Sequence, residues 1–315
     1  MAKRAIKRVG RDSVFRTAAG GGDPGVFQCK PTVRKSRPYK PHCFTPAEIQ
    51  LSVFQEFIIY MVFLRRGLDK DILAKLFLGA TTKPALRVIK SVLRTWVAGL
   101  DGILKAEEWW LKPEHKDRAK SRAFSGEFGE EVLAVADCTN VNCEGSTLSE
   151  LINQQLYSTY YKHTCGKYAV ACSRVGGCIA CAPGQGGPAG DHQCMVQAGL
   201  FDPDKWKVED GKPWPQMLYD AGVTARTKTA AQQAGCDLVT SGIVRKSKSN
   251  TLSFAQRSTN FRVSSLRIRV ENFIGIIKRH FKILRTVIPL SDIGMMDKIV
   301  YACFMLHNFG SLIIE

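Results

Sequence analysis

Four short apolar segments between residues 131 and 220 constrain the fold of this chain most strongly. They read EVLAVAD at 131–137, KYAVACS at 167–173, GGCIACA at 176–182 and PQMLYD at 215–220. Each has the length and apolar character of a strand, and DHQCMVQAGLF, which precedes the fourth, has the pattern of a helix. The order predicts a mixed α/β domain with a central mixed sheet flanked by helices. Acids stand at the ends of the first and fourth strands.

The charge balance points to a polyanionic partner. The 315 residues include 45 Lys and Arg against 28 Asp and Glu, a formal net charge of +17, and such an excess attracts nucleic acid over long distances. The longest apolar runs, such as 57–64, are shorter than the roughly 18 residues of a spanning helix, so no membrane partner is expected. Eleven cysteines and no apolar signal segment after MAKRAIKRVGRD indicate a reducing compartment with mostly free thiols.

The N-terminal part divides into an arm and a helical module. Residues 1–44 hold eleven Lys and Arg against two Asp, with several Gly and Pro and no apolar periodicity, which predicts a basic flexible arm. The arm either contacts phosphates and directs nuclear import or is a solvated tail. Residues 45–112 predict helices, of which the first begins at TPAE, buries Val53, Phe57 and Tyr60, and ends near Gly67.

Two further helices, DKDILAKLF and TKPALRVIKSVLRTWVAGL, are joined by a short turn that contains Gly79. The second has an apolar face, made of Leu86, Ile89, Leu93 and Val97. Its other face is basic. This outline predicts a helix-turn-helix, with a plain helical hairpin as the alternative. The residues expected to contact DNA are Thr82, Lys83, Arg87, Lys90 and Arg94.

The C-terminal third contains one long amphipathic segment, RIRVENFIGIIKRHFKIL at 267–284. At about 100° per residue, one stripe of the helix is apolar and consists of Val270, Phe273, Ile274, Ile277 and Phe281. A second stripe along its flank consists of Arg267, Glu271, Lys278 and Lys282. By itself this pattern also fits an ordinary helix with an Arg–Glu pair. The preceding stretch 224–265 is polar and is expected to be a loop, either solvated or in contact with the DNA backbone, whereas MDKIVYACFMLHNF predicts a helix over the sheet.

Taken in order, several motifs resemble those of one family. DCTNV at 137–141, YSTYYKHTCGK at 157–167, GGPAGD at 186–191, DAGV at 220–223 and the helix at 267–284 resemble the DDE-superfamily endonuclease domain of Harbinger-like transposases and their bacterial insertion-sequence relatives. The resemblance runs from roughly residue 45 to 310. It implies a ribonuclease-H-like catalytic domain at 126–312, with 224–265 as an insertion, preceded by the helix-turn-helix module at 45–112.

The resemblance also implies a catalytic triad of Asp137, Asp220 and Glu271 that holds two Mg²⁺ or Mn²⁺ ions. Phosphodiester cleavage needs two ions roughly 3.5–4 Å apart, and hard cations take carboxylate oxygens. Asp191 is a rival for the second position. It begins a helix, where an acid is a natural N-cap, so we favour Asp220, which follows the fourth strand, and expect Asp191 to be an accessory residue.

Further residues are expected to contact DNA by the same resemblance, namely Lys162, Lys167, Arg267, Lys278 and Lys282. The implied partners are double-stranded DNA at element ends and targets, a second DNA-binding protein and further copies of the chain. The implied location is the nucleus, or the cytoplasm if the source is not eukaryotic. Asn140, Val223 and Ser264 depart from the family pattern, which leaves open a domesticated copy that binds DNA without cutting it. Cys178 and Cys181 are expected to be core residues rather than zinc ligands, because no second pair follows.

Overall fold

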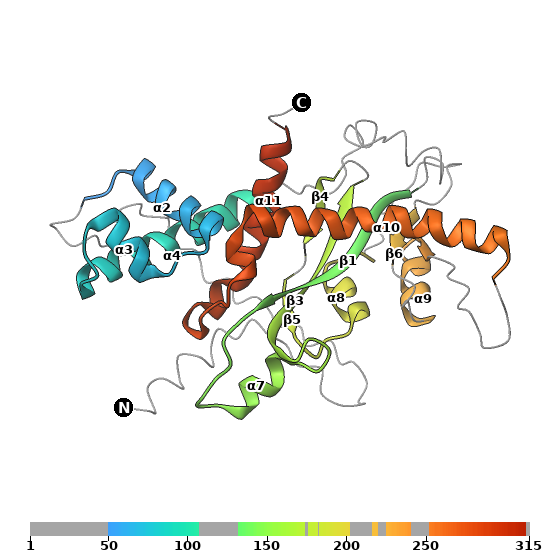
Figure 1. Cartoon of the computed structure of the whole chain (residues 1–315), viewed down its shortest axis with the longest axis horizontal. Coiled ribbons are helices and arrows are strands. Elements are labelled where there is room, and N and C mark those ends of the chain that lie inside the picture. Colours follow the sequence, from blue (N-terminus) through green and yellow to red (C-terminus); the bar gives the residue numbers. More distant parts are fainter. Residues whose placement is uncertain are drawn as a thin grey trace.

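A computed structural model of the protein describes residues 50–106, 132–173, 176–181, 183–201, 216–219, 225–240 and 252–312. Figure 1 shows three helices at one end of the molecule and a curled sheet at the other, with two long C-terminal helices between and across them. The predicted basic arm at 1–44 lies outside the described residues. None of the described helices is long and apolar enough to cross a membrane.

The three N-terminal helices are α2 (Val53–Arg66), α3 (Lys70–Leu78) and α4 (Lys83–Ala106). Ser52 is extended and forms a capping box with Gln55, so α2 begins at Val53 and the described chain before it is not helical. The prediction of one helix from TPAE onward was therefore wrong at its start. Val53 is 61% exposed, whereas Tyr60 is buried as predicted, together with Ile59, Phe63 and Leu64. The predicted ends are confirmed, because Gly67 and Gly79 close α2 and α3 in the left-handed conformation.

The sheet is mixed, as the sequence predicts. Its strands are β1 (Val132–Asn142), β2 (Tyr157–Ser158), β3 (His163–Ser173), β4 (Cys178–Cys181), β5 (Gln185–Gly186), β6 (Gln216–Tyr219) and β7 (Asp237–Thr240). β3 pairs antiparallel with β1, β2, β4 and β5, whereas β6 pairs parallel with both β1 and β7. β1 therefore lies in the middle, between the antiparallel and the parallel part of the sheet.

Each face of the sheet has its own core. Val135, Val141 and Tyr168 belong to a core with α2–α4, α10 (Phe254–His280) and α11 (Met296–Leu312). Ala136 and Ala171 belong to a second, with residues of α8 (Asp191–Gln197). Successive residues of a strand point to opposite faces, so alternate β1 residues contribute to different cores.

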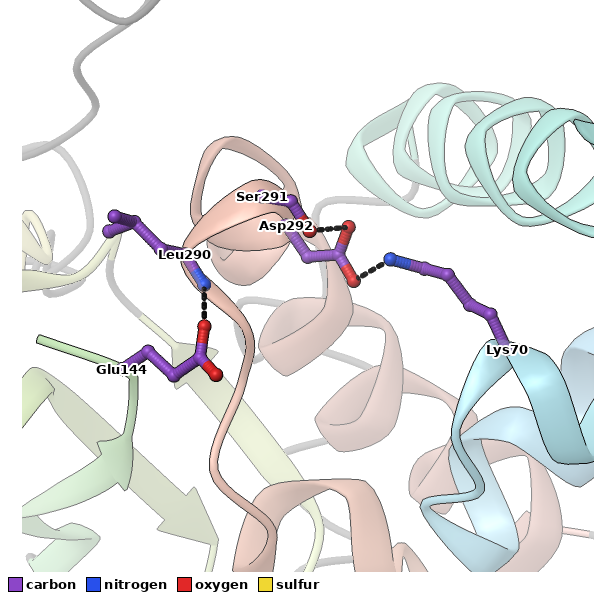
Figure 2. A network of polar contacts seen from close by, with 5 residues as sticks. All are labelled: Lys70, Glu144, Leu290, Ser291 and Asp292. Carbon is purple, nitrogen blue, oxygen red and sulfur yellow. Dashed lines mark hydrogen bonds and ion pairs between the residues drawn. The ribbon is translucent and has the colours of Figure 1, made fainter. Parts of the chain in front are cut away.

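The helical module and the sheet domain share the first core. α4 packs against α11, and α2 packs against η2 (Lys282–Arg285). Figure 2 shows a polar link at the same junction, where Lys70 of α3 forms an ion pair with the buried Asp292 of η3 (Leu290–Met295). Next to it, the backbone N–H of Leu290 donates to Glu144 Oε2 at 2.9 Å, just beyond β1.

The stretch 224–265, expected to be a loop, contains regular structure in its described part. It includes α9 (Ala225–Gln233), β7 and the beginning of α10. Residues of α9 buried there are the small Thr227 and Ala231, which give almost no apolar periodicity in the sequence. The start of α10 had a readable signal, since Ser253 and Gln256 form a capping box. Helix α7 (Glu150–Leu156) was not predicted either.

Candidate active site

Asp137 lies in the middle of the central strand. The sequence predicts that the strand ends here, but β1 continues to Asn142 because it keeps pairing with β3, from Ala134↔Ser173 to Asn142↔Cys165. The half-buried Asp137 is opposite Val170. Its Oδ1 accepts a hydrogen bond from the backbone N–H of Cys138 at 2.8 Å, which holds the carboxylate against its own strand.

The strand that precedes Asp220 lies directly beside β1. β6 (Gln216–Tyr219) is formed as predicted and runs parallel to β1, with Val135 paired to Leu218. Asp137 follows Val135 by two residues, and Asp220 follows Leu218 by two residues in the sequence. Asp220 itself lies outside the described residues.

Glu271 is on α10, at the edge of the buried stripe. The predicted apolar stripe is confirmed, since Val270, Phe273, Ile274, Ile277 and Phe281 are all buried. Glu271 is exposed. The helix ends at His280, so Lys282 belongs to the separate short helix η2 and is exposed there.

Lys278 joins this helix to the central strand. Its Nζ donates to the backbone oxygen of Asn140 at 2.7 Å, and α10 packs on β1. Burial lowers the pKa of Lys278 to about 8, with a smaller effect of Arg285 in the same direction. The ammonium is thus partly desolvated inside the α10–β1 contact.

The Lys278–Asn140 contact sets the level of Glu271 along β1. Glu271 precedes Lys278 by two helical turns, or about 10 Å, and Asp137 precedes Asn140 by three strand residues, also about 10 Å. Both elements run in the same general direction in Figure 1, and the chain beyond them pairs in parallel at Cys143↔Ile288. This spacing predicts that Glu271 and Asp137 lie at about the same level, on the face of the sheet that α10 covers.

Cys172 of β3 lies near the same acid. Burial raises the pKa of its thiol to about 12; among nearby charges Asp137 raises that pKa further, while Arg269 of α10 lowers it. Cys172 and Asp137 belong to β-strand positions whose side chains share one face. Arg269 thus brings a positive charge from α10 into the neighbourhood of Asp137.

Asp191 lies on the opposite face. Gly190 is the N-cap of α8, and Asp191 is the first helical residue and makes an ion pair with Lys167 at 2.5 Å. Lys167 pairs with Asn140, one position out of phase with Asp137, so its side chain points to the α8 face. The N-cap prediction was wrong by one residue, and the carboxylate binds a lysine rather than backbone N–H groups.

The ammonium of Lys167 is bound by other groups of the protein. It also donates to the backbone oxygen of Ala189 at 3.1 Å, and only 15% of its side chain is exposed. Burial opposes its charge, but Asp191 prevails and raises the pKa of Lys167 above its ordinary value. Lys167 and Asp191 thus neutralise each other beside the sheet.

The other residues expected to contact DNA have different positions. α3, the turn at Gly79 and α4 form two helices as predicted, and the basic stripe of α4 is exposed while Ile89, Leu93 and Val97 are buried. This stripe consists of Lys83, Arg87, Lys90 and Arg94, with the exposed Thr82 before it. Lys162 is exposed in the turn before β3. Arg267 lies within α10, but its side chain is outside what the structure describes.

The donor set suits a hard cation. Asp137 and Glu271 offer carboxylate oxygens from two elements in contact, which is the ligand type of Mg²⁺ and Mn²⁺. The nine described cysteines are free, and seven of them are buried. Cys178 and Cys181 lie in β4, where Cys178 is buried in the first core and the half-buried Cys181 packs against it, as expected of core residues. Among the described residues, no three His, Cys, Asp or Glu side chains gather as a metal site.

The turn at residues 159–162, between β2 and β3, is a feature that the sequence did not predict as a site. Burial raises the pKa of Tyr161; Lys167 lowers it, and Asp191, Tyr160 and Asp137 raise it further. Two adjacent tyrosines in a polar turn were the available signal. Aromatic side chains outside the apolar periodicity of an element often have a binding role.

Comparison with known proteins identifies the family. Residues 136–308, more than half of the chain, match the family model of the DDE superfamily endonuclease. The chain therefore belongs to the DDE superfamily endonuclease family. Neither the curated proteins nor the solved structures include a match to it.

Proposed function

We propose that this protein is a DNA transposase of the Harbinger-like type, which cuts DNA at transposon ends and joins it to a target. The observation that supports this most is that α10, the helix of Glu271, packs on β1, the strand of Asp137, and is joined to it through Lys278. Two acids from distant parts of the sequence thus lie on elements in contact, which suits a site where both offer oxygen ligands.

The sheet supports a ribonuclease-H-like domain. The strand path is β2-β3-β1-β6-β7, with β4 also paired to β3. The pairs of β3 with β4 and with β1 are antiparallel, whereas the pairs β1–β6 and β6–β7 are parallel. This is the mixed order expected of that fold. It supports Asp220 as the third acid, because Val135 of β1 pairs with Leu218 of β6 and each acid follows its paired residue by two positions in the sequence.

In the proposed mechanism Asp137, Asp220 and Glu271 hold two Mg²⁺ or Mn²⁺ ions. When bound, such ions activate the attacking water or 3′-hydroxyl and stabilise the leaving oxygen. The chain's own residues position this site: Lys278 ties α10 to β1 through Asn140, and the Cys138 N–H holds the Asp137 carboxylate. Asp191, which is bound to Lys167 on the other face, has at most a supporting role for the sheet.

We further propose that α3 and α4 form a helix-turn-helix that binds double-stranded DNA. The support is the exposed stripe of Lys83, Arg87, Lys90 and Arg94 beside a buried apolar face and the net charge of +17. Lys162, Lys278, Lys282 and Arg267 are proposed to contact the DNA strand nearer the acids. A second DNA-binding protein, assembly into oligomers and a nuclear location complete the proposal.

The test is cleavage of DNA that contains the element's own flanking repeats, with Mg²⁺ or Mn²⁺. Asp137→Asn and Glu271→Gln should each lower the cleavage rate by about 100-fold or more, without loss of DNA binding. Glu150→Gln is the matched control, since it changes an exposed acid on α7, and it should retain most of the activity. Equal rates in all variants would contradict the catalytic assignment, and binding without cleavage by the unmodified chain would indicate a domesticated copy.

A further inference from the structure

The turn between β2 and β3, residues 159–162, presents an aromatic ring to solvent. Tyr160 is 83% exposed. Its ring meets that of Tyr161 edge to face, with centroids 4.9 Å apart and planes at 88°. An edge-to-face contact leaves a face of a ring available for stacking.

The backbone of the turn is held in one conformation. Buried Ser158 accepts two hydrogen bonds, from Tyr161 N to its Oγ at 3.2 Å and from Lys162 N to its backbone oxygen at 2.8 Å. Lys162 has a φ of +61°, the only positive φ of a non-glycine residue in the described ranges. A non-glycine residue adopts this conformation only when its surroundings impose it, and such residues cluster at binding sites. The ring of Tyr160 is thus presented by an ordered turn.

The turn is tied to the central strand at Asn140, whose side chain points to the face opposite that of Asp137. The Nδ1–H of His163 donates to the backbone oxygen of Tyr161 at 2.8 Å, which leaves Nε2 to accept from Asn140 Nδ2 at 3.3 Å. The backbone oxygen of Asn140 in turn accepts from Lys278. Asn140 therefore connects the turn to the contact that sets the level of Glu271, three residues from Asp137.

The charges around the turn suit a nucleic acid strand. Lys162 is exposed next to the tyrosines, and Lys278 is directed to the same part of β1. A DNA strand that passes this end of β1 would therefore meet the ammonium of Lys162 beside the exposed ring of Tyr160. Every base has a π-face, so stacking on an aromatic side chain tolerates any sequence.

We infer that Tyr160 is a nucleobase-stacking site that receives an unpaired base of the bound DNA strand. The inference rests on the proposed function for the identity of the strand. It adds to that function a specific ligand, which is an unstacked base and not duplex DNA. It also adds a binding residue, Tyr160, to the three proposed acids. A base that leaves the duplex would be held by the ring while Lys162 contacts the adjoining phosphate.

The experiment uses the full chain and oligonucleotides with 2-aminopurine at an unpaired position beside a nick, or at the same position fully paired. Ca²⁺ replaces Mg²⁺ so that binding is measured without cleavage. The variants are Tyr160→Ala, Tyr160→Phe, which keeps the ring, and Phe54→Ala, which removes an aromatic residue that is 71% exposed on the remote helix α2. Fluorescence quenching and anisotropy are recorded, and thermal unfolding of each variant checks its fold.

We expect quenching of the unpaired 2-aminopurine by the unmodified chain, by Tyr160→Phe and by Phe54→Ala. Tyr160→Ala should abolish it and weaken binding of the unpaired oligonucleotide by about tenfold, with much less effect on the paired one. No quenching by the unmodified chain, or equal weakening for paired and unpaired DNA, would overturn the inference. Cleavage is not measured in this experiment. If the protein does not cut DNA, quenching is still expected, and if quenching is absent, the effect of Asp137→Asn on cleavage is still expected.

Discussion

The charged side chains of this protein differ in how far they are exposed to water, and Lys278 is a partly buried lysine. Its ammonium donates to Asn140 O while partly buried under α10, and burial lowers its pKa to about 8. An unfolded lysine titrates near 10.4. Between these two values the unfolded chain binds more protons than the folded chain, so this residue makes stability rise with pH in that window.

We therefore predict that Lys278→Met removes this rise. In the unmodified chain the urea midpoint should increase between pH 7.5 and 9.5 relative to the variant, because the cost of the buried charge disappears as the lysine is deprotonated. The control is Lys282→Met, which removes an exposed lysine of η2 and should leave the pH dependence unchanged. Parallel curves for the unmodified chain and Lys278→Met would show that the ammonium is fully hydrated.

The Lys167–Asp191 pair provides a second prediction at this scale. Asp191 keeps Lys167 charged in spite of burial, since the pKa of Lys167 is raised. Asp191→Asn removes the partner that compensates for desolvation, so the variant should be less stable by about 1–3 kcal/mol at neutral pH. Chemical denaturation would measure the difference. The double variant Asp191→Asn with Lys167→Met should recover part of it, because no buried charge is then left alone, and failure to recover would argue against the pair.

At the scale of elements, the sequence predicts what local apolar periodicity determines. The buried stripe of α10 and the apolar and basic faces of α4 follow directly from spacing. The second half of β1 does not, because Thr139 and Asn140 extend the strand only through pairing with β3. α9 buries a threonine and an alanine, and β7 depends on its pairing with β6.

The same limit applies to the candidate site. Strand alternation fixes that Asp137 and Lys167 point to opposite faces, but only once the register of β1 and β3 is known. The sequence could thus nominate Asp137, Glu271 and Asp191 as acids in neighbouring segments. It could not show that Asp191 is bound to Lys167 on the α8 side, because a shift of one residue in the register reverses the faces.

Gly67 and Gly79 allow the contact between α2 and η2 to be tested by substitution. Gly67 ends α2 at φ +62°, and a Cβ there would be 2.8 Å from Thr286 Cγ2 and 3.1 Å from the backbone N of Ile283. Gly79 ends α3 at φ +69° with nothing within 4 Å of such a Cβ. We predict that Gly79→Ala costs about 1 kcal/mol from the left-handed backbone alone. Gly67→Ala should cost clearly more, as measured by urea unfolding, and equal losses would mean that the α2–η2 contact yields easily.

At the scale of the whole molecule, the exposed cations of α4 are expected to dominate the salt dependence of DNA binding. Each phosphate contact contributes about 0.9 to the slope of log K against log salt. Arg87→Ala together with Arg94→Ala should therefore lower the slope by about 2 and weaken binding to all duplex sequences. Lys228→Ala, an exposed lysine on α9, is the control. An unchanged slope in the double variant would exclude α4 from the DNA contact.

Because α2–α4 and the sheet domain share one core, neither part is expected to fold without the other. Leu93 and Val97 of α4 belong to the same buried cluster as Ile299 and Phe304 of α11, and Lys70 pairs with the buried Asp292 across the junction. Removing the helices would expose the apolar face of α11 and leave Asp292 without its partner, and both changes cost free energy that a domain of marginal stability does not have in excess.

We predict that α2–α4 and the sheet domain of the full chain unfold together in one cooperative transition. Near- and far-UV circular dichroism in increasing denaturant would measure it. A fragment of residues 107–315 should be insoluble or lack a cooperative transition, and the helices added as a separate chain should not bind it tightly. A soluble fragment that unfolds cooperatively would instead make the helices an accessory unit. In that case their DNA contacts would be independent of the site at Asp137, whereas a shared core passes any displacement of α4 to α11 and the sheet.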